Sequence, residues 1–452
     1  MKILLTNPKT VNVFESFGFV FPPLGLLYVA AVAEQSGHNV KIEDFRISRH
    51  SHASYDYQSY DIVGITTDTR RFQGAMEIAK RAKDLGRTVV MGGPHPAFSD
   101  EEILKSGCVD FIVKGEGEVT FPALLDGIGK GADLSSIKGL SYLNKGSIVS
   151  TPQPELIQDL DALPLPARHL TDIEAYKRAG LRYGGKRPVA VISSSRGCTH
   201  NCSFCLTPRM YGNIWRARSA SSVIAEIKEV YHTYGYRAVA FCDDNFTVSP
   251  ERVKEICSMI IESGLDIWWW CLSTPATLLK NEDMVRLMSK SGAKTVYIGV
   301  ESVNPSTLKE FNKGLTTDIP QKAANLLKKN GIEVFASYIL GGVNDDLRTM
   351  LATIKFARKL DTSVAQFTIL TPYPGTTLHR NISGLLRHRR WHLYDGFHLV
   401  FRHGKVSFVM MHLLLIWAYV RYYARSRRAA RGFMNALKNN MPVVRKILGK
   451  SK

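Results

Sequence analysis

Short apolar runs alternate with amphipathic segments along residues 1–150. Buried parallel strands read as near-continuous runs of branched apolar residues, whereas amphipathic helices repeat their apolar positions with the helical period. The alternation predicts a doubly wound α/β sheet, a Rossmann-like domain, with helices over residues 25–35 and 73–85. The expected strands cover residues 1–5, 61–65, 88–91 and 111–113.

Loops rich in glycine and polar residues follow these strands. Sheets of this type bind ligands outside the carboxyl ends of their strands, and glycine allows backbone amides to approach a ligand closely. Tight strand-to-helix turns also need glycine for conformational reasons alone, so a purely structural role stays open. The candidate ligand-contacting residues in these loops are Thr67, Gly92, Gly93, His95, Gly115 and Glu116.

A second pattern begins after a linker over residues 151–185. Between residues 186 and 385, apolar runs repeatedly end in polar loops and are followed by helical patterns. The repeat predicts an open (β/α)6 barrel whose functional residues lie at the carboxyl ends of its strands. The expected strands cover residues 189–193, 238–241, 295–298, 334–338 and 365–370.

Hydropathy changes again in a basic, helical tail that we expect over residues 386–452. Residues 406–420 form an uncharged run of fifteen residues, shorter than the ~20 that a membrane-spanning helix needs. The run leads into an arginine-rich segment and an amphipathic stretch over 432–448. This combination predicts a helix that lies in the interface of an anionic membrane. A buried helix that packs on the barrel is one alternative, and a nucleic-acid contact is another.

Composition and charge narrow the class of protein. The chain has 452 residues, 45% of them hydrophobic, which is enough to bury at least two cores. Seven cysteines, without a signal-peptide pattern at the start, favour a cytoplasmic enzyme over a disulfide-stabilised scaffold. Residues 380–452 contribute +15 of the net charge of +19, so the positive surplus belongs to the expected tail.

Candidate chemistry is concentrated at Cys198, Cys202 and Cys205. Three thiolates on one tight loop can hold three irons of a cubane 4Fe-4S cluster and leave the fourth iron open for a ligand that is not protein. Structural zinc is the alternative, with His200 or His232 as the fourth ligand. The Cys-x3-Cys-x2-Cys spacing differs from the Cys-x2-Cys pairs of closed zinc sites, which favours the cluster.

The cysteine motif and its flanks resemble the radical S-adenosylmethionine (SAM) superfamily, whose members bind SAM at the open iron. By this resemblance, Asp243, Asp244 and Asn245 lie near the amino end of SAM, and Glu301 contributes to its binding. Charge-assisted hydrogen bonds suit carboxylates to such a role. Helix capping by the two aspartates and a simple ion pair of Glu301 are the structural alternatives.

The glycine loops of the first domain and the linker motif over residues 163–168 resemble the cobalamin-binding branch of this superfamily. The resemblance implies that the candidate loop residues of the first domain contact cobalamin. Many such domains carry an Asp-x-His-x-x-Gly motif whose imidazole binds cobalt, but this chain offers only Asp44 and His50 at that place. Members of the branch that lack the motif hold cobalamin without an axial histidine. A degenerate domain that binds no cofactor is the alternative.

The branch includes anaerobic magnesium-protoporphyrin monomethyl ester cyclases and hopanoid-modifying enzymes. The resemblance therefore implies C-methylation or oxidative cyclisation of a membrane-soluble lipid or tetrapyrrole. SAM would be cleaved reductively to a 5′-deoxyadenosyl radical, with electrons from a donor such as flavodoxin or ferredoxin. No individual catalytic residue is assigned.

Two rival functions stay open, a non-catalytic binding protein that retains the fold and modification of RNA. Intact Cys198, Cys202 and Cys205 argue against the first. Methylthiolation of RNA usually needs a second cluster held by the N-terminal domain, and Cys108 is the only cysteine before Cys198. Nucleic acid is therefore not an expected partner.

Overall fold

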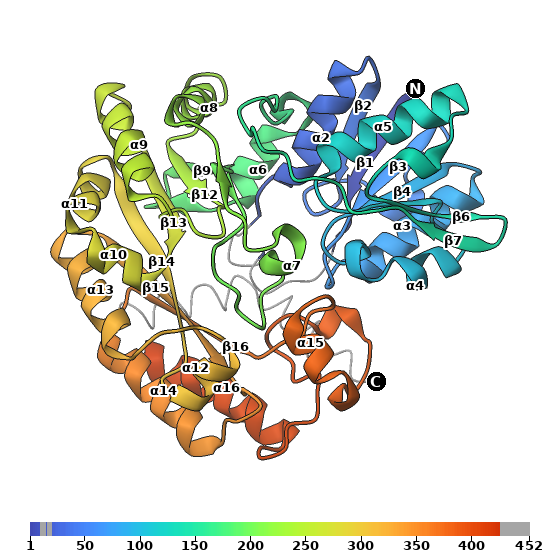
Figure 1. The fold of residues 1–452 in the computed structure, drawn as a ribbon. Helices are drawn as coiled ribbons and strands as arrows, with labels where there is room; N and C mark the ends of the chain where they lie inside the picture. The colour runs from blue at the N-terminus through green and yellow to red at the C-terminus, as the bar shows by residue number, and fades with distance from the viewer. Residues whose placement is uncertain (10–14, 16–19, 425–452) are drawn as a thin grey trace.

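The structure, a computed structural model, describes residues 1–9, 15 and 20–424. Two seven-stranded sheets form its framework. Figure 1 shows the N-terminal sheet and its helices on the right and the second sheet as an open arc on the left. Helix α7 (Thr207–Tyr211) lies between them, so the hollow of the arc faces the N-terminal domain.

The N-terminal sheet has the strand order β2-β1-β3-β4-β5-β6-β7. Strands β1 to β5 are parallel, as predicted, and the order reverses between β1 and β3. A hairpin that was not predicted adds two antiparallel strands at one edge, with Lys145 and Gly146 at positive φ in its turn. The strands are β1 (Lys2–Asn7), β2 (Asn39–Asp44), β3 (Ile62–Thr66), β4 (Thr88–Gly92), β5 (Phe111–Val113), β6 (Leu140–Asn144) and β7 (Ser147–Ser150).

Helices cover both faces of this sheet because successive residues of a strand point to opposite sides. Ile3 and Leu5 of β1 belong to the apolar core beneath α2 and α5, whereas Leu4 belongs to the core beneath α3. The doubly wound domain and both of its predicted helices are therefore confirmed. The helices are α2 (Leu24–Gln35), α3 (Phe72–Asp84), α4 (Asp100–Lys105) and α5 (Gly117–Lys130).

The second sheet has the order β16-β15-β14-β13-β12-β9-β8. Its strands from β9 to β16 are parallel, and the short β8 pairs antiparallel at one edge. Helices alternate with these strands and lie outside the arc, which confirms the open (β/α)6 barrel. The strands are β8 (Arg182–Tyr183), β9 (Arg187–Ile192), β12 (Ala238–Phe241), β13 (Trp268–Ser273), β14 (Ala293–Glu301), β15 (Glu333–Leu340) and β16 (Val364–Ile369). The helices are α8 (Ala220–His232), α9 (Pro250–Glu262), α10 (Pro275–Lys280), α11 (Glu282–Lys290), α12 (Pro305–Glu310), α13 (Asp318–Lys329) and α14 (Leu347–Leu360).

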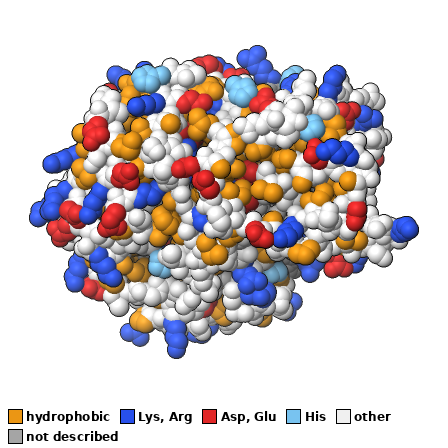
Figure 2. Space-filling view, turned by 45° about the horizontal axis from the view of Figure 1, so that its top comes forward, with side chains coloured by type: hydrophobic (Ala, Val, Ile, Leu, Met, Phe, Trp, Pro, Cys, Tyr) orange, Lys and Arg blue, Asp and Glu red, His pale blue; other side chains and the backbone are white. Residues whose placement is uncertain are grey.

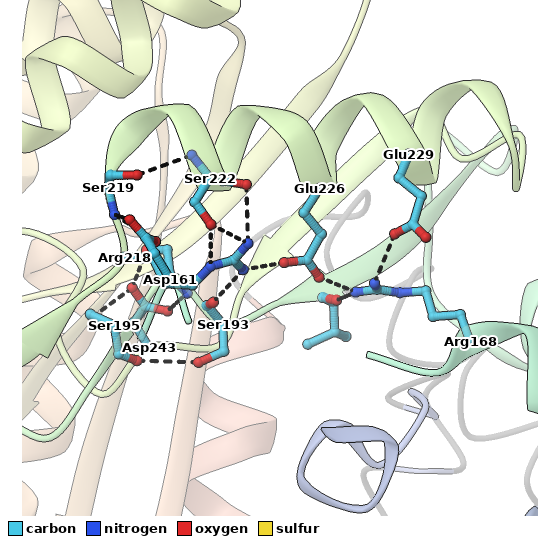
Figure 3. A network of polar contacts seen from close by, with 12 residues as sticks. Asp161, Arg168, Ser193, Ser195, Arg218, Ser219, Ser222, Glu226, Glu229 and Asp243 are labelled. Atoms are coloured by element: carbon cyan, nitrogen blue, oxygen red, sulfur yellow. Dashed lines mark hydrogen bonds and ion pairs between the residues drawn. The ribbon is translucent and has the colours of Figure 1, made fainter. Parts of the chain in front are cut away.

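Arg168 fastens the linker between the domains to the barrel (Figure 3). Its side chain is 2% exposed and donates hydrogen bonds to the carboxylate of Glu226 and to the carbonyl oxygen of Val191. Glu226, on α8, also pairs with Arg218. Removing one partner of a buried ion pair typically costs about 3–5 kcal/mol. The linker motif that marked the family resemblance therefore has a structural role in holding the barrel and the linker together.

The chain returns to the N-terminal domain after the last barrel strand. Trp391 and Tyr394 belong to the same apolar core as α3, and the Trp391 ring centroid lies 5.2 Å from that of His95. The segment around residues 391–394 therefore packs on the N-terminal domain. The remaining short helices of the linker and of this segment are α6 (Ile173–Ala179) and α15 (Thr377–Asn381).

Helix α16 (Phe408–Tyr423) covers the edge of the barrel sheet. The Tyr419 hydroxyl donates to the carbonyl oxygen of Phe367 at 2.9 Å and accepts from the backbone N–H of Phe367 at 3.2 Å. Tyr423 makes the same pair of contacts with Ala365. Uncovered edge strands attract other chains, so these hydroxyls satisfy backbone groups of β16 that a further strand would otherwise pair with. The helix packs on the barrel, as in the alternative interpretation of the uncharged run.

The two faces of α16 differ in exposure although both are apolar. The inner face, at most 6% exposed, comprises Met411, Leu414, Leu415, Ala418 and Tyr422. The outer face, 40–65% exposed, comprises Phe408, Val409, Met410, Leu413, Ile416, Trp417 and Val420. No described helix is long and apolar enough to cross a membrane. The arginine-rich segment after residue 424 and the amphipathic stretch over 432–448 lie outside the described residues.

The surface of the folded domains carries both signs of charge. Figure 2 shows Lys and Arg side chains interspersed with Asp and Glu on the face that it presents, with apolar side chains gathered between them. Because residues 380–452 contribute +15 of the net charge of +19, the rest of the chain is close to neutral. The positive surplus is therefore concentrated at the C-terminal end.

Candidate functional site

The cysteine loop begins at the carboxyl end of β9. A two-residue strand, β10 (Ser195–Arg196), pairs with β11 (Arg216–Ala217) and leads into Gly197. Gly197 has a φ of 84°, and a Cβ at this position would collide with the carbonyl oxygen of Ile214. Glycine is therefore required at the turn that directs the chain into Cys198.

The three predicted cluster ligands gather on this loop. Cys198, Cys202 and Cys205 are half-buried free thiols that lie within electrostatic reach of one another. Burial raises the pKa of each thiol, to about 11 for Cys202. Among the described residues, no group of three or more His, Cys, Asp or Glu side chains converges on a position for a single metal ion. A cubane cluster instead needs one thiolate for each of three separate irons.

Asp243 follows β12 and supports the start of the cysteine loop (Figure 3). Its carboxylate accepts a hydrogen bond from the backbone N–H of Ser194 at 2.7 Å. The hydroxyls of Ser194 and Ser195 also donate to it, at 2.5 and 2.7 Å. Burial raises the pKa of Asp243, and these hydrogen bonds oppose the shift. Both carboxylate oxygens are thus engaged by the chain that leads into the cluster motif.

Asp244 has a different environment from Asp243, since it lines a cavity between the two domains. Its Oδ1 accepts a hydrogen bond from the Thr207 hydroxyl at 2.9 Å, and burial raises the pKa of its carboxyl. Asn245 is buried, and its side-chain oxygen accepts a 3.3 Å bond from Thr247. Ser249 is the N-cap of α9, so helix capping does not explain the two aspartates.

Glu301 ends β14 in a strained backbone conformation. Its φ is 64°, which is uncommon for a residue other than glycine, and the strand pairing shifts register between Gly299 and Glu301. The carboxylate accepts a hydrogen bond from Lys313 Nζ at 2.9 Å, with side chains 7% and 16% exposed. The ion pair considered as an alternative is therefore present. Strain of this kind clusters at functional sites.

The cavity has a volume of about 600 Å³ and lies between the carboxyl ends of the two sheets. Its N-terminal wall includes residues at the ends of four parallel strands, namely Leu5, Thr66, Gly92 and Val113. Its barrel wall includes Ser193, Cys242 and Asp244, together with residues of α7. The N-terminal wall spans the point between β1 and β3 where the strand order reverses, which is the usual ligand site of such sheets.

Several residues singled out in the sequence line this cavity, namely Gly92, Gly93, Gly115, Glu116 and Asp244. A Cβ on Gly93, which has a φ of 106°, would lie 2.6 Å from the carbonyl oxygen of Thr67. The Glu116 carboxylate pairs with Arg196 and Arg216, so it also joins the N-terminal domain to the cysteine loop. None of the described residues that line the cavity is a histidine.

His95 and Thr67 are not part of the cavity wall. The ring of His95 packs against Phe72 and Trp391, at centroid distances of 4.3 and 5.2 Å, and its Nδ1 lies 3.2 Å from the Thr69 hydroxyl. Burial lowers the pKa of His95 to about 4, so the imidazole is neutral at neutral pH. Its place in the structure is between the N-terminal domain and the segment that follows the barrel.

Other residues of the cavity were not identified from the hydropathy pattern. Arg196 pairs with Glu116 and Glu118 at 2.8 and 2.6 Å, and its guanidinium lies 5.3 Å from the Tyr28 ring centroid. Cys242 also lines the cavity and is exposed. The position of Arg196 just before the cysteine loop is the one sequence feature that marks it.

Comparison with known proteins decides the family. A model of the radical SAM superfamily matches residues 192–357, and a model of the B12 binding domain matches residues 11–125. The chain is also 37% identical, over 94% of its length and 93% of the relative, to an uncharacterised methyltransferase of Pyrococcus horikoshii. The chain belongs to the cobalamin-binding radical SAM enzymes. This enzyme is thus of the methyltransferase or oxidative cyclase type.

Two further similarities extend over most of this radical SAM enzyme. It is 28% identical, over 90% of its length and 84% of the relative, to bacteriochlorophyllide d C-12(1)-methyltransferase of Chlorobaculum tepidum. The cobalamin-dependent SAM radical enzyme OxsB has the same fold, with a TM-score of 0.77 at 16% identity. That comparison covers 99% of this chain and 71% of OxsB.

The family identifies the cofactors as a 4Fe-4S cluster, SAM and cobalamin, and the enzyme needs a reductant. The residues present fit these groups. Three neighbouring thiols on one loop suit a cluster with one open iron. A cavity of about 600 Å³ at the switch point of a parallel sheet suits a large ligand.

Proposed function

We propose that this enzyme methylates an unactivated carbon of a large apolar substrate, a lipid or a tetrapyrrole. The observation that carries the proposal is the shared cavity, because its walls belong to the cobalamin-binding domain and to the barrel at once. When bound, the cluster and SAM supply the radical that activates the C–H bond, and cobalamin supplies the methyl group. The protein supplies binding, orientation and exclusion of water.

We assign the cluster to Cys198, Cys202 and Cys205. We propose that Asp243 positions their loop through its hydrogen bonds with Ser194. Asp243 is thus a support for the site, although the family resemblance places it beside SAM.

We assign SAM to the barrel side of the cavity, where Asp244 accepts a hydrogen bond from Thr207. Asn245 is buried in the loop that follows β12. We also propose that Glu301, which ends β14 and lies outside the described cavity wall, contributes to SAM binding. A carboxylate there is suited to an ammonium group or to ribose hydroxyls. The reductant delivers its electron to the cluster, and a small electron-transfer protein such as flavodoxin or ferredoxin is the proposed donor.

We assign cobalamin to the N-terminal wall. Gly92, Gly93 and Gly115 line this wall. A Cβ on Gly93 or Gly115 would contact Thr67 or Pro154, so the packing of the chain itself also requires these two glycines. Glu116 contributes to the wall while its charge is balanced by Arg196 and Arg216. The proposed cobalamin contacts do not include His95 and Thr67, because neither residue lines the cavity.

An apolar substrate also fits a protein that binds membranes, and we propose that the outer face of α16 contacts an anionic bilayer. The exposed apolar side chains of that face form a continuous stripe on one side of the helix. Helix α14, which packs beside α16, presents Arg348, Lys355, Arg358 and Lys359 and contains no acidic residue. Each basic residue near an anionic surface contributes about 1 kcal/mol. We propose that apolar contact by α16 and attraction by the basic residues of α14 both contribute to binding.

Isotope transfer tests the proposed reaction. We expect the reconstituted enzyme, given reductant, cobalamin, trideuteromethyl-SAM and an extract of lipids and pigments, to produce a molecule that has gained a trideuteromethyl group in place of one hydrogen. Omission of cobalamin should remove this product. A product that has lost hydrogen without gaining the label would instead indicate oxidative cyclisation, and mass spectrometry distinguishes the two.

A further inference from the structure

The segment between α12 and α13 is bound to the cysteine loop. The backbone N–H of Ser203 donates to the carbonyl oxygen of Phe311 at 3.0 Å, and the Ser203 hydroxyl donates to the carbonyl oxygen of Glu310 at 2.8 Å. The side-chain amide of Asn312 donates to the carbonyl oxygen of Asn201 at 2.9 Å. These hydrogen bonds anchor residues 310–312 to the cysteine loop. Lys313 is the next residue in the chain.

The side chain of Lys313 is held inside the protein by Glu301. The ammonium donates to Glu301 Oε1 at 2.9 Å, and the Lys313 side chain is 16% exposed. A Cβ at position 299 would lie 2.8 Å from Lys313 Nζ, so the glycine there leaves the space that the ammonium uses. A lysine is seldom this deeply buried unless it is paired. Glu301 on one side and the backbone at residue 299 on the other therefore fix the position of the Lys313 ammonium.

The ammonium of Lys313 lies within electrostatic reach of all three cluster-loop thiols. Burial lowers the pKa of Lys313, but the Glu301 carboxylate at 2.9 Å opposes that effect and keeps the pKa above its ordinary value. Lys313 is therefore a positive charge in a low-dielectric region beside the cluster motif. Charges act more strongly there than in water.

We propose that Lys313 is a fixed cation that raises the reduction potential of the cluster, and that Glu301 positions it and moderates its charge. Reduction adds one electron to the cluster, so a neighbouring positive charge stabilises the reduced form. Net charge and hydrogen bonding are established determinants of cluster potentials. The proposal rests on the cluster being held by Cys198, Cys202 and Cys205, and it does not depend on the substrate or on methyl transfer.

Redox titration of the reconstituted holoenzyme, followed by electron paramagnetic resonance without SAM or substrate, tests this role. In Lys313→Met the ratio of reduced to oxidised cluster at a fixed solution potential should fall at least about tenfold, or about 59 mV for one electron. Lys313→Arg keeps the charge and should stay near the parent. Lys322→Met is the matched control, because Lys322 pairs with Asp318 on the exposed surface of α13, and it should not change the ratio.

Glu301→Gln should shift the reduction potential of the cluster in the opposite direction to Lys313→Met. The variant removes the negative charge that opposes Lys313, so the reduced fraction at the same potential should rise. A Lys313→Met protein with full iron and sulfide content and an unchanged ratio would overturn the proposal. If Lys313→Met does not retain the cluster, Glu301→Gln decides alone, and an unchanged or lower reduced fraction would then overturn it. A structural role would change cluster content in both variants without shifting the potential in opposite directions.

Discussion

Replacing Cys202 with alanine should abolish the iron–sulfur cluster and all cleavage of SAM. Two thiolates cannot hold a cubane whose fourth iron must stay open, and the described residues offer no third thiol at this loop to replace Cys202. The readouts are iron and sulfide content, the brown chromophore and the yield of 5′-deoxyadenosine under reducing conditions. The expected loss is complete, because SAM has no other iron to bind.

Cys108→Ala is the matched control for this change. Cys108 is half-buried in the N-terminal domain, where its thiol lies 3.7 Å from the carbonyl oxygen of Ser106. The control should retain the cluster and produce 5′-deoxyadenosine at the parental rate. Formation of 5′-deoxyadenosine by Cys202→Ala at a rate comparable with the control would show that the cluster assignment is wrong.

Deleting α16 should prevent stable folding of the barrel. A chain that ends at Gly404 loses the buried inner face of the helix and the tyrosine hydroxyls that pair with β16. Truncating one buried leucine or methionine to alanine costs about 2–5 kcal/mol, and an entire domain is typically stable by only about 5–15 kcal/mol. A chain that ends at Ala424 keeps these contacts and should unfold at a higher temperature than the chain that ends at Gly404. Thermal unfolding followed by circular dichroism measures both.

The two faces of α16 can be separated by side-chain substitutions. Leu415→Ala, on the inner face, should lower stability by about 2–5 kcal/mol, whereas Leu413→Gln with Ile416→Gln, on the outer face, should leave it unchanged. The outer-face variant should sediment less with anionic vesicles than the parent. Salt should release the parent only in part, because the Debye length falls from about 8 Å at 0.15 M to about 3 Å at 1 M while apolar contact persists. Equal sedimentation of the parent and the outer-face variant would contradict the membrane proposal.

The truncation at Gly404 tests the other role of α16. If that truncated chain is as stable as the parent, α16 is not needed to cover the edge of the barrel sheet.

The strands of both parallel sheets could be predicted because burial on two faces leaves a clear signature. Strands such as Val89–Met91 and Val334–Ala336 are continuous apolar runs, and glycine or polar loops follow them. The cluster-binding motif could also be predicted from the sequence, because the spacing of its three cysteines alone indicates an iron–sulfur cluster. The β6–β7 hairpin escaped prediction since Ser147–Ser150 is an edge strand whose residues are not buried, so its pattern is weak.

The role of α16 could not be predicted from hydropathy. An uncharged helix has the same composition whether it lies in a membrane interface or covers a sheet edge, and α16 is apolar on both its buried and its exposed face. Only the tertiary contacts of Tyr419 and Tyr423 with β16 distinguish the two. This is why the sequence alone favoured the membrane interface over packing on the barrel for this helix.

Neighbouring polar residues in the site illustrate a second limit. Asp243 and Asp244 are adjacent in sequence, yet the first supports the cysteine loop and the second lines the cavity. His95 resembles a ligand residue in sequence but is packed between two aromatic rings. A family motif identifies which segment reaches the site, whereas side-chain direction depends on packing that a single sequence does not reveal.

Retention of cobalamin tests the central claim that the cavity between the domains holds the cofactor. Gly25 lines this cavity, and a Cβ there meets nothing within 4 Å, so Gly25→Phe should occupy the space without disturbing the fold. Gly384 also has open space around a Cβ but lies outside the cavity, which makes Gly384→Phe the matched control. After anaerobic incubation with hydroxocobalamin and gel filtration, the parent and Gly384→Phe should retain the cofactor, and a folded Gly25→Phe should lose it. Absence of cobalamin from the parent, or equal retention by a folded Gly25→Phe, would contradict the account.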